Sequence, residues 1–350
     1  MIIIFITILT LLILVHELGH FLAARANGVK VEEFGIGFPP RLVKIKRKNT
    51  IFSINAIPLG GFIKMLGEEE EVNKKDSFSN KSIGQRFLIL TAGVLANFIL
   101  AILLFSIGFS VGMPLLASTT SDHPYAKNIK DEVRIMSIKP DSPAEHAGLV
   151  AGDIIENING NIFRNTAEVS DYTKKMAGHK VNVLIKSNGV ELSKQINLDK
   201  SEAPLGIAPL VISSATYSWY LSPLAAFWES GRIIKATVLA VGSLVTNIFT
   251  RFTVPEGVAG PVGIFVLTSE IIKLGWRFVL TFIAFLSLSL AIINILPFPA
   301  LDGGRVVFLA IEKIRGKRVS PRVENITHLI GFILLISLII LVTYFDIKKF

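Results

Sequence analysis

The chain contains 350 residues, of which 51% are hydrophobic and 18% are charged, and its mean hydropathy is +0.57. A single soluble core does not need this much apolar sequence, so the composition excludes an ordinary soluble domain and indicates several membrane spans. Lys and Arg exceed Asp and Glu by nine charges. The absence of cysteine excludes disulfide scaffolds and thiolate metal sites, which leaves His, Asp and Glu as candidate metal ligands.

Residues 1–24 form the first apolar stretch and predict an uncleaved first transmembrane helix, since no basic leader precedes the stretch. The stretch contains the sequence HELGH at residues 16–20. Because residues four apart share one face of a helix, His16 and His20 can bind one zinc ion while Glu17 can reach a water on that ion. Ionisable groups are costly inside a membrane and usually mark a functional site. The alternative is that both histidines only pack against neighbouring helices.

Residues 25–86 carry 12 Lys and Arg, which predicts a cytoplasmic loop. Within the loop, two apolar segments punctuated by Gly and Pro, residues 35–40 and 51–65, favour a β-hairpin that dips into the membrane as a re-entrant β region. An ordinary hairpin lying on the lipid head groups is the alternative. The acidic run at residues 68–71 is interpreted as a solvated part of the same loop.

Further apolar stretches predict three more transmembrane helices, at residues 87–114, 278–304 and 328–346. Six Lys and Arg between residues 297 and 322 place that loop in the cytoplasm with the first loop, so both termini face outward. Residues 222–252 predict an amphipathic helix in the membrane interface, because their apolar run is short and has basic neighbours. A fifth span is the alternative, and it would place the two basic loops on opposite sides.

Residues 130–210, between the second and third spans, have the composition of a small β-rich domain. Two sequences, DSPAEHAGLVAGDIIENING at residues 141–160 and KVNVLIKSNG at residues 180–189, resemble the PDZ domains of bacterial proteases. This resemblance implies that the domain binds an extended peptide by strand addition beside a helix. The alternative is a spacer that only screens access to the membrane site.

A catalytic zinc ion needs a third protein ligand, and acidic residues near the apolar spans are few. The best candidate is Asp302, in the sequence NILPFPALDGG at residues 294–304. Pro297 and Pro299 break the helix, and the Gly-Gly pair after Asp302 permits tight turns, so a carboxylate can point inward from a short unwound segment. An ordinary loop or helix-cap role for Asp302 is the alternative.

These motifs together resemble the site-2 protease family, close to its RseP-like bacterial branch. The resemblance rests on HELGH, on TAGVLANF at residues 91–98, on NILPFPALDGG and on a single PDZ-like insert, and it covers nearly the whole chain. Together with the apolar stretches, it predicts an α-helical polytopic membrane protein with about four transmembrane helices, a membrane-associated β-hairpin region and an inserted β-rich PDZ-like domain. The chain departs from the family at Val94, where Pro is common, and in having one PDZ module where some relatives carry two.

The resemblance also implies the roles of individual residues. The implied Zn²⁺ ligands are His16, His20 and Asp302. The implied catalytic acid/base is Glu17. The re-entrant β element is expected to pair with an extended substrate, and the residues expected to border that substrate are Gly35, Gly37, Gly60 and Gly61. Asn294 is expected to contact the substrate backbone, with an inter-helix hydrogen bond as the alternative.

The implied function is that of a zinc-dependent intramembrane endopeptidase that cuts the transmembrane segments of single-span proteins, such as anti-sigma factors or signal-peptide remnants. The expected partners are these substrates, peptides or C-termini bound by the PDZ-like domain, and the lipid bilayer, with no nucleic acid. The expected location is the bacterial cytoplasmic (inner) membrane, with the active site near the cytoplasmic face and the PDZ-like domain outside. The alternative function is a PDZ-bearing scaffold with a non-catalytic metal site.

Overall fold

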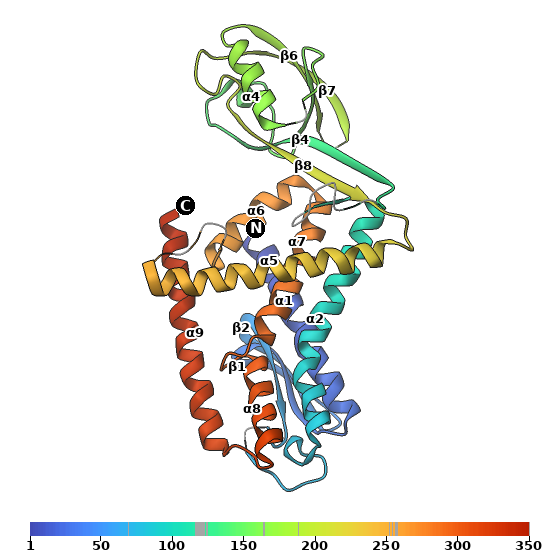
Figure 1. Ribbon diagram of the computed structural model, residues 1–350, viewed down its shortest axis with the longest axis vertical. Coiled ribbons are helices and arrows are strands. Elements are labelled where there is room, and N and C mark those ends of the chain that lie inside the picture. Colours follow the sequence, from blue (N-terminus) through green and yellow to red (C-terminus); the bar gives the residue numbers. More distant parts are fainter. Residues whose placement is uncertain are drawn as a thin grey trace. The chain divides into compact units, whose positions relative to one another are not determined.

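The computed structural model describes residues 1–68, 70–115, 123, 125–163, 165–187, 189–251, 253, 255 and 258–349. The chain divides into two compact units, whose elements are shown in Figure 1. Unit 1 consists of residues 1–103, 233–266 and 283–350, and unit 2 consists of residues 104–232 and 267–282. Several helices therefore belong to unit 1 over one part of their length and to unit 2 over the other.

Five helices in the described ranges are long and apolar enough to cross a membrane. They are α1 (Ile2–Ala26), α2 (Ile83–Val111), α5 (Ser222–Arg251), α7 (Trp276–Ile295) and α9 (Pro321–Lys349). The most apolar window has a mean hydropathy of 1.2 in α5 and of 2.4 to 2.6 in the other four. The lower value is in line with the interfacial helix predicted at residues 222–252, and the number of spans stays a prediction.

The third predicted span, residues 278–304, is not one continuous helix. Helix α7 ends at Ile295, since Pro297 and Pro299 follow it, and Asp302 begins a separate helix, α8 (Asp302–Arg315). Helix α8 ends at Gly316, whose φ of +67° is in the left-handed region that glycine adopts at helix ends. The basic loop expected after Asp302 is therefore mostly an amphipathic helix.

The hairpin expected within residues 25–86 consists of β1 (Val31–Arg47) and β2 (Thr50–Met65). Both strands bend, so that the chain runs through this sheet four times. Residues 33–36 pair with residues 61–64 on one side and with residues 51–54 on the other, while residues 41–47 pair with residues 50–55. The segment that ends β2 is therefore an edge of the sheet in the described structure. The insertion of this hairpin into a membrane stays a prediction.

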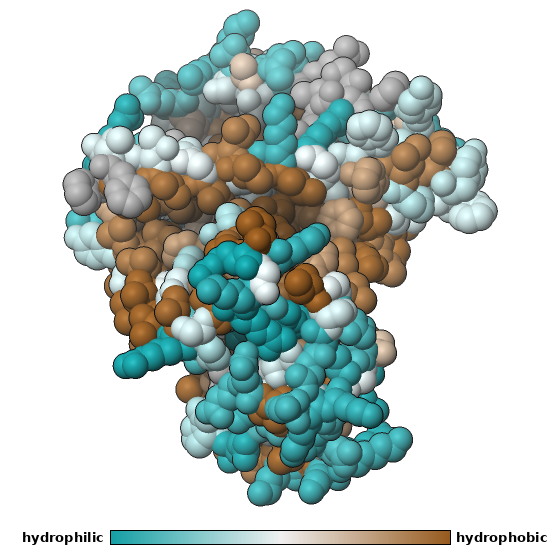
Figure 2. Space-filling view, turned by 60° about the horizontal axis from the view of Figure 1, so that its bottom comes forward, coloured by the Kyte–Doolittle hydropathy of each residue, from teal (hydrophilic) through white to brown (hydrophobic). Residues whose placement is uncertain are grey.

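A small apolar core holds the hairpin beside the helices of unit 1 (Figure 1). Its members come from the end of α1, the hairpin, a short 3-10 helix (Phe78–Asn80), the start of α2 and from α8, and they are Ala24, Val29, Val31, Met65, Phe78, Ile89, Leu90 and Leu309. Figure 2 shows hydrophilic side chains gathered at the end of unit 1 that carries the α8–α9 connection, beside a hydrophobic surface over the helices. This core fixes α8, and hence Asp302, relative to α1.

Unit 2 contains a six-stranded antiparallel sheet with the order β3-β8-β4-β5-β6-β7. Its strands are β3 (Met113–Pro114), β4 (Asn128–Ile138), β5 (Ile154–Ile158), β6 (Lys180–Ser187), β7 (Val190–Asn197) and β8 (Ile207–Thr216). The sheet thus extends beyond the predicted boundaries of 130–210. Asn188, in one of the PDZ-like sequences, lies outside the described residues.

Two short helices complete the PDZ-like domain, α3 (Pro143–His146) and α4 (Thr166–Lys175). Each has a side-chain N-cap, because Ser142 accepts a hydrogen bond from the backbone N–H of Glu145 and Asn165 accepts one from that of Glu168. The apolar sides of the strands and of α4 enclose a core that includes Ile135, Ile158 and Val183, all fully buried. Helix α6 (Pro261–Leu274) lies between α5 and α7 in the chain.

Candidate metal centre

Helix α1 places two imidazoles on one buried face. His16 is 7% exposed and His20 is 6% exposed, and their Nε2 atoms lie 3.1 Å apart. The four-residue spacing of HELGH produces this arrangement, because residues four apart along a helix stand one above the other. The structure therefore brings together the two histidines that the motif predicted as zinc ligands.

The first residue of α8 brings a carboxylate to the same point. Asp302 Oδ2 lies 3.0 Å from His16 Nε2 and 3.3 Å from His20 Nε2. In the described residues, this group is the one set of three or more His, Asp or Glu side chains arranged to hold a metal ion. Asp302 joins it because the proline-interrupted segment after α7 turns the chain back toward α1.

The three atoms fit a zinc ion. Tetrahedral zinc with ligands at about 2.0–2.1 Å keeps its ligand atoms about 3.3 Å from one another, close to the separations of the two imidazole nitrogens and the carboxylate oxygen. Asp302 Oδ2 is buried and accepts no hydrogen bond within the described part of the chain. Three electron-pair donors crowded at one buried point are the arrangement that a cation stabilises.

A backbone carbonyl of α2 sets the tautomer of His20. The carbonyl oxygen of Ile89 can only accept, so the imidazole Nδ1, 2.8 Å away, must donate its proton to it. The lone pair of the neutral ring is then on Nε2, which faces His16 and Asp302. Hydrogen bonds of this kind orient metal-binding histidines and increase their basicity.

Position 93 of α2 must be glycine, because the two imidazoles approach α2 closely at this point. This role was not predicted from the sequence. A methyl group at position 93 would lie 2.7 Å from His20 Cδ2 and 2.8 Å from His16 Cε1, and nearer still to His20 Nε2. Gly19 on α1 is equally constrained, since its Cβ would overlap the backbone of Ala92. The Ala-Gly pair in TAGVLANF was the available signal, because small residues allow close packing of membrane helices.

Glu17 lies on the side of α1 that faces the hairpin. A Cβ at Gly61 would lie 3.2 Å from Glu17 Cγ and 3.1 Å from the carbonyl oxygen of Gly35, so Gly61 lets β2 pass close to α1. Gly37 and Gly60, with φ of +79° and +105°, form bends of the sheet that favour glycine. Of the glycines predicted to border a substrate, Gly61 thus lies beside the proposed acid/base, and Gly35 lies next to Gly61.

Asn294, the residue predicted to contact the substrate backbone, has no hydrogen bond that links it to this centre in the described part of the chain. It is the next-to-last residue of α7, is partly exposed and makes no side-chain hydrogen bond to another described residue. The structure therefore does not favour the inter-helix hydrogen bond that was the alternative role for Asn294.

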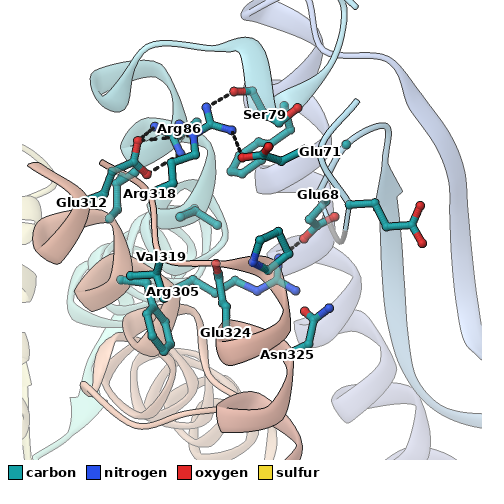
Figure 3. A pocket seen from close by; sticks show the side chains of 17 residues that line it. Glu68, Glu71, Ser79, Arg86, Arg305, Glu312, Arg318, Val319, Glu324 and Asn325 are labelled. Atoms are coloured by element: carbon teal, nitrogen blue, oxygen red, sulfur yellow. Dashed lines mark hydrogen bonds and ion pairs between the residues drawn. The ribbon is translucent and has the colours of Figure 1, made fainter. Parts of the chain in front are cut away.

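Ion pairs hold α8 against the loop that follows β2 (Figure 3). Arg305, one turn after Asp302, pairs with Glu68. Further along α8, Glu312 accepts two hydrogen bonds from Arg86 at the start of α2, at 2.8 and 2.5 Å. The interpretation of the acidic run 68–71 as a solvated loop is thus wrong for Glu68, whose side chain is only 13% exposed. The partner, 237 residues away in the sequence, could not be inferred from the run alone.

The hydrogen bonds from Arg86 hold the pKa of the Glu312 carboxyl below its usual value. The nearby charge of Glu68 raises the pKa of Arg305 above that of an ordinary guanidinium. Both charges are therefore stabilised by their partners, and together they fix the helix that carries Asp302.

The profile of peptidase family M50 matches residues 4–338. The chain belongs to peptidase family M50. The site-2 protease resemblance drawn from the motifs is thereby confirmed, and the chain is a peptidase with several membrane helices.

Curated relatives match along almost their whole length. A protein of Clostridium perfringens, provisionally named as a zinc metalloprotease, is 34% identical over 339 residues, which cover 96% of this chain and 95% of the relative. The zinc metalloprotease RasP of Geobacillus kaustophilus is 28% identical, and the alignment covers 99% of this chain and 97% of RasP. The solved structure of a PDZ domain from an SdrC-like protein of Listeria monocytogenes is 35% identical in sequence, with a TM-score of 0.21. The match covers 23% of this chain and 88% of the Listeria domain.

Proposed function

We propose that this M50 peptidase is a zinc-dependent intramembrane endopeptidase in which His16, His20 and Asp302 bind the metal ion and Glu17 is the acid/base. The observation that carries the proposal is the group of three ligand atoms, 3.0 to 3.3 Å from one another, two of them on a helix apolar enough to span a membrane and the third on α8. A scaffold with a structural metal site does not need a carboxylate such as Glu17 next to its ligands.

Each side chain has a distinct task in peptide hydrolysis. Zinc, when bound, supplies a Lewis acid that lowers the pKa of a water to about 7 and polarises the scissile carbonyl. The hydrogen bond to Ile89 orients His20 and keeps the Nδ1 proton on the side away from the metal, so that Nε2 faces the ion. Glu17 accepts a proton from the attacking water on its carboxylate and then gives a proton to the nitrogen of the leaving amine.

The edge of the hairpin is proposed to hold the substrate in an extended form. A peptide bond inside a helix is shielded by its own backbone, so a transmembrane substrate must unwind before attack. Residues 61–64 pair with residues 33–36 on one side, and their other side is free of strand partners in the described structure. Because Gly61 lies beside Glu17, a strand added at this edge would run past the acid/base.

The PDZ-like domain offers a second edge for a peptide. Strand β8 pairs with β4 along its length on one side, while β3 covers only Ala215 and Ser214 on the other. We propose that the open part of this edge binds an extended ectodomain segment or a C-terminus outside the cytoplasm. The proposed topology has four spans, with α5 in the interface and both basic loops in the cytoplasm.

The proposed substrates are single-span proteins, such as membrane-anchored regulators and signal-peptide remnants, cut near the cytoplasmic face. The test reconstitutes the purified chain and its Glu17→Gln variant with a tagged single-span peptide and locates the cut by mass spectrometry. Cleavage inside the span by the wild type alone, abolished by a zinc chelator, is the expected result. Equal cleavage by both proteins would refute the role of Glu17. Zinc binding without cleavage of any peptide in a panel would favour the scaffold.

A further inference from the structure

A basic pocket of about 520 Å³ lies within unit 2, between the sheet of the PDZ-like domain and the α6–α7 corner. Strands β4 and β6, the turn before β5 and residues 273–278 surround it. Its lining includes five cationic side chains and two acidic ones, which are Lys130, Arg134, Lys186, Lys273 and Arg277, and Glu132 and Asp153. This excess of positive charge within one cavity requires an explanation.

Most of the negative charge near the pocket is already engaged. Glu132 pairs with Arg134 at 2.7 Å, and Glu270 pairs with Lys273 at 2.8 Å. Asp153 is 2% exposed, and its carboxylate accepts a hydrogen bond from the backbone N–H of Val150. Three further cations, Lys130, Lys186 and Arg277, have no ion-pair partner among the described residues. Cations gathered around one cavity create a positive potential that attracts an anion.

Tight contacts give the pocket a defined wall. The guanidinium of Arg134 donates a hydrogen bond to the carbonyl oxygen of Gly152 and lies over the ring of Phe278, 5.0 Å from its centre. Gly152, with a φ of +99°, packs so closely that a Cβ there would lie 2.6 Å from the carbonyl oxygen of Lys273. The turn before β5 is therefore seated on the α6–α7 corner, and the pocket is not an open gap between loose segments.

The pocket also lies where a membrane helix begins. Trp276 is the first residue of α7 and is 61% exposed, and Arg277 follows it. An exposed Trp beside a basic residue at the end of an apolar helix is typical of the membrane–water interface, at the depth of the lipid phosphates. A neighbouring cavity of about 190 Å³ shares Lys130, Arg134 and Arg277 and reaches Gly112, just after the end of α2. The cations thus lie beside the ends of two membrane helices.

We propose that the basic pocket binds the phosphate-bearing head group of an anionic phospholipid and so docks the PDZ-like domain on the bilayer. An ammonium-bearing zwitterionic head group would bring its own cation to the three unpaired ones, whereas an anionic head group neutralises them. The lipid would fix the orientation of the peptide-binding domain at the membrane surface. This inference requires the chain to be in a membrane and does not depend on its proteolytic activity.

The test compares lipid retention by two charge-matched variants of the full-length chain. The pocket variant carries Lys130→Gln and Arg277→Gln, and the control carries Lys139→Gln and Lys180→Gln, two exposed lysines of the same domain that do not line the pocket. Each protein is purified in detergent and titrated with phosphatidylglycerol or phosphatidylcholine, and bound lipid is counted by native mass spectrometry. Thermal unfolding of each protein shows that the variants are folded.

The expected result is that wild type and control bind phosphatidylglycerol at least tenfold more tightly than phosphatidylcholine, while the pocket variant loses this preference. Equal retention of phosphatidylglycerol by the pocket variant and the control would overturn the proposal. Titration with inorganic phosphate separates the lipid from a free anion, since binding of phosphate without a preference for phosphatidylglycerol would also overturn it. None of these results depends on peptide cleavage, so failure here leaves the proposed protease untouched.

Discussion

Replacing Gly93 by Ala should damage the metal centre although it adds one methyl group and favours the helix. Ala is better than Gly in a helix by about 1 kcal/mol. The added methyl would, however, lie 2.7 Å from His20 Cδ2 and 2.8 Å from His16 Cε1, whereas carbon atoms in contact stay about 3.5–4.0 Å apart. One or both rings must therefore move by roughly 1 Å, which is several times the tolerance of about 0.2 Å on metal–ligand distances.

The expected loss is large because both affected rings are proposed ligands. Changing a residue that merely supports a ligand costs about 10–100-fold in metal affinity, so we expect Gly93→Ala to weaken zinc binding by about 100-fold. Overpacking should also cost about 1–3 kcal/mol, which is offset by about 1 kcal/mol of helix propensity, so the net loss of stability should be up to about 2 kcal/mol. Zinc affinity is measured by competition with a chromophoric chelator, and stability by thermal unfolding of the metal-free protein.

Gly84→Ala is the matched control, because Gly84 is on the same helix and a Cβ there meets no atom within 4 Å. It should bind zinc as the wild type does and be equally stable or slightly more stable. If Gly93→Ala bound zinc as tightly as the wild type, the reasoning would be refuted. The metal centre would then tolerate the displacement of the rings that the added methyl group requires. A loss of affinity in both variants would mean that the helix, and not the contact, is responsible.

Three further predictions concern charged side chains of unit 1. Glu17→Gln should abolish cleavage and leave zinc affinity within about twofold of the wild type, because Glu17 is proposed to move a proton and not to bind metal; lost zinc in this variant would contradict that division. Glu68→Gln should weaken zinc binding by up to about tenfold, because Arg305, one turn after Asp302, loses its ion-pair partner. The double variant Glu68→Arg with Arg305→Glu, which exchanges the two charges, should recover part of this loss. Unchanged zinc affinity in Glu68→Gln would exclude a positioning role for the ion pair. The hydrogen bond from Arg86 lowers the pKa of Glu312, so its stabilising effect is present above roughly pH 4.5, the ordinary value, and is lost as the pH falls through the lowered value. Thermal unfolding at several pH values should therefore show a steeper loss on acidification for the wild type than for Glu312→Gln, and parallel curves would refute this.

Local sequence was enough to predict the histidine pair. The spacing of His16 and His20 fixes their relation on any helix, whatever surrounds them. Asp302 was also predicted, because the prolines before it and the glycines after it indicate an interruption at the end of a span. The structure places the carboxylate where that interpretation required it.

Contacts between distant segments could not be predicted in this way. Glu68 and Arg305 carry no mark of each other in their local sequences, and the acidic run of residues 68–71 is typical of a solvated loop. The constraint on Gly93 depends on how closely α2 approaches α1, a distance set by packing along both helices. Helix α8 was missed because the basic charge of the segment after Asp302 was interpreted as that of a cytoplasmic loop.

The distance along the chain between the halves of the metal centre also orders its appearance in time. The ribosome makes His16 and His20 near the start of the chain and Asp302 near its end. At about 5–20 residues per second, the carboxylate follows the imidazoles by on the order of tens of seconds. A nascent chain with its first helices already in the bilayer therefore holds only part of the proposed ligand set, and under the proposed mechanism it could not yet cut its neighbours or itself.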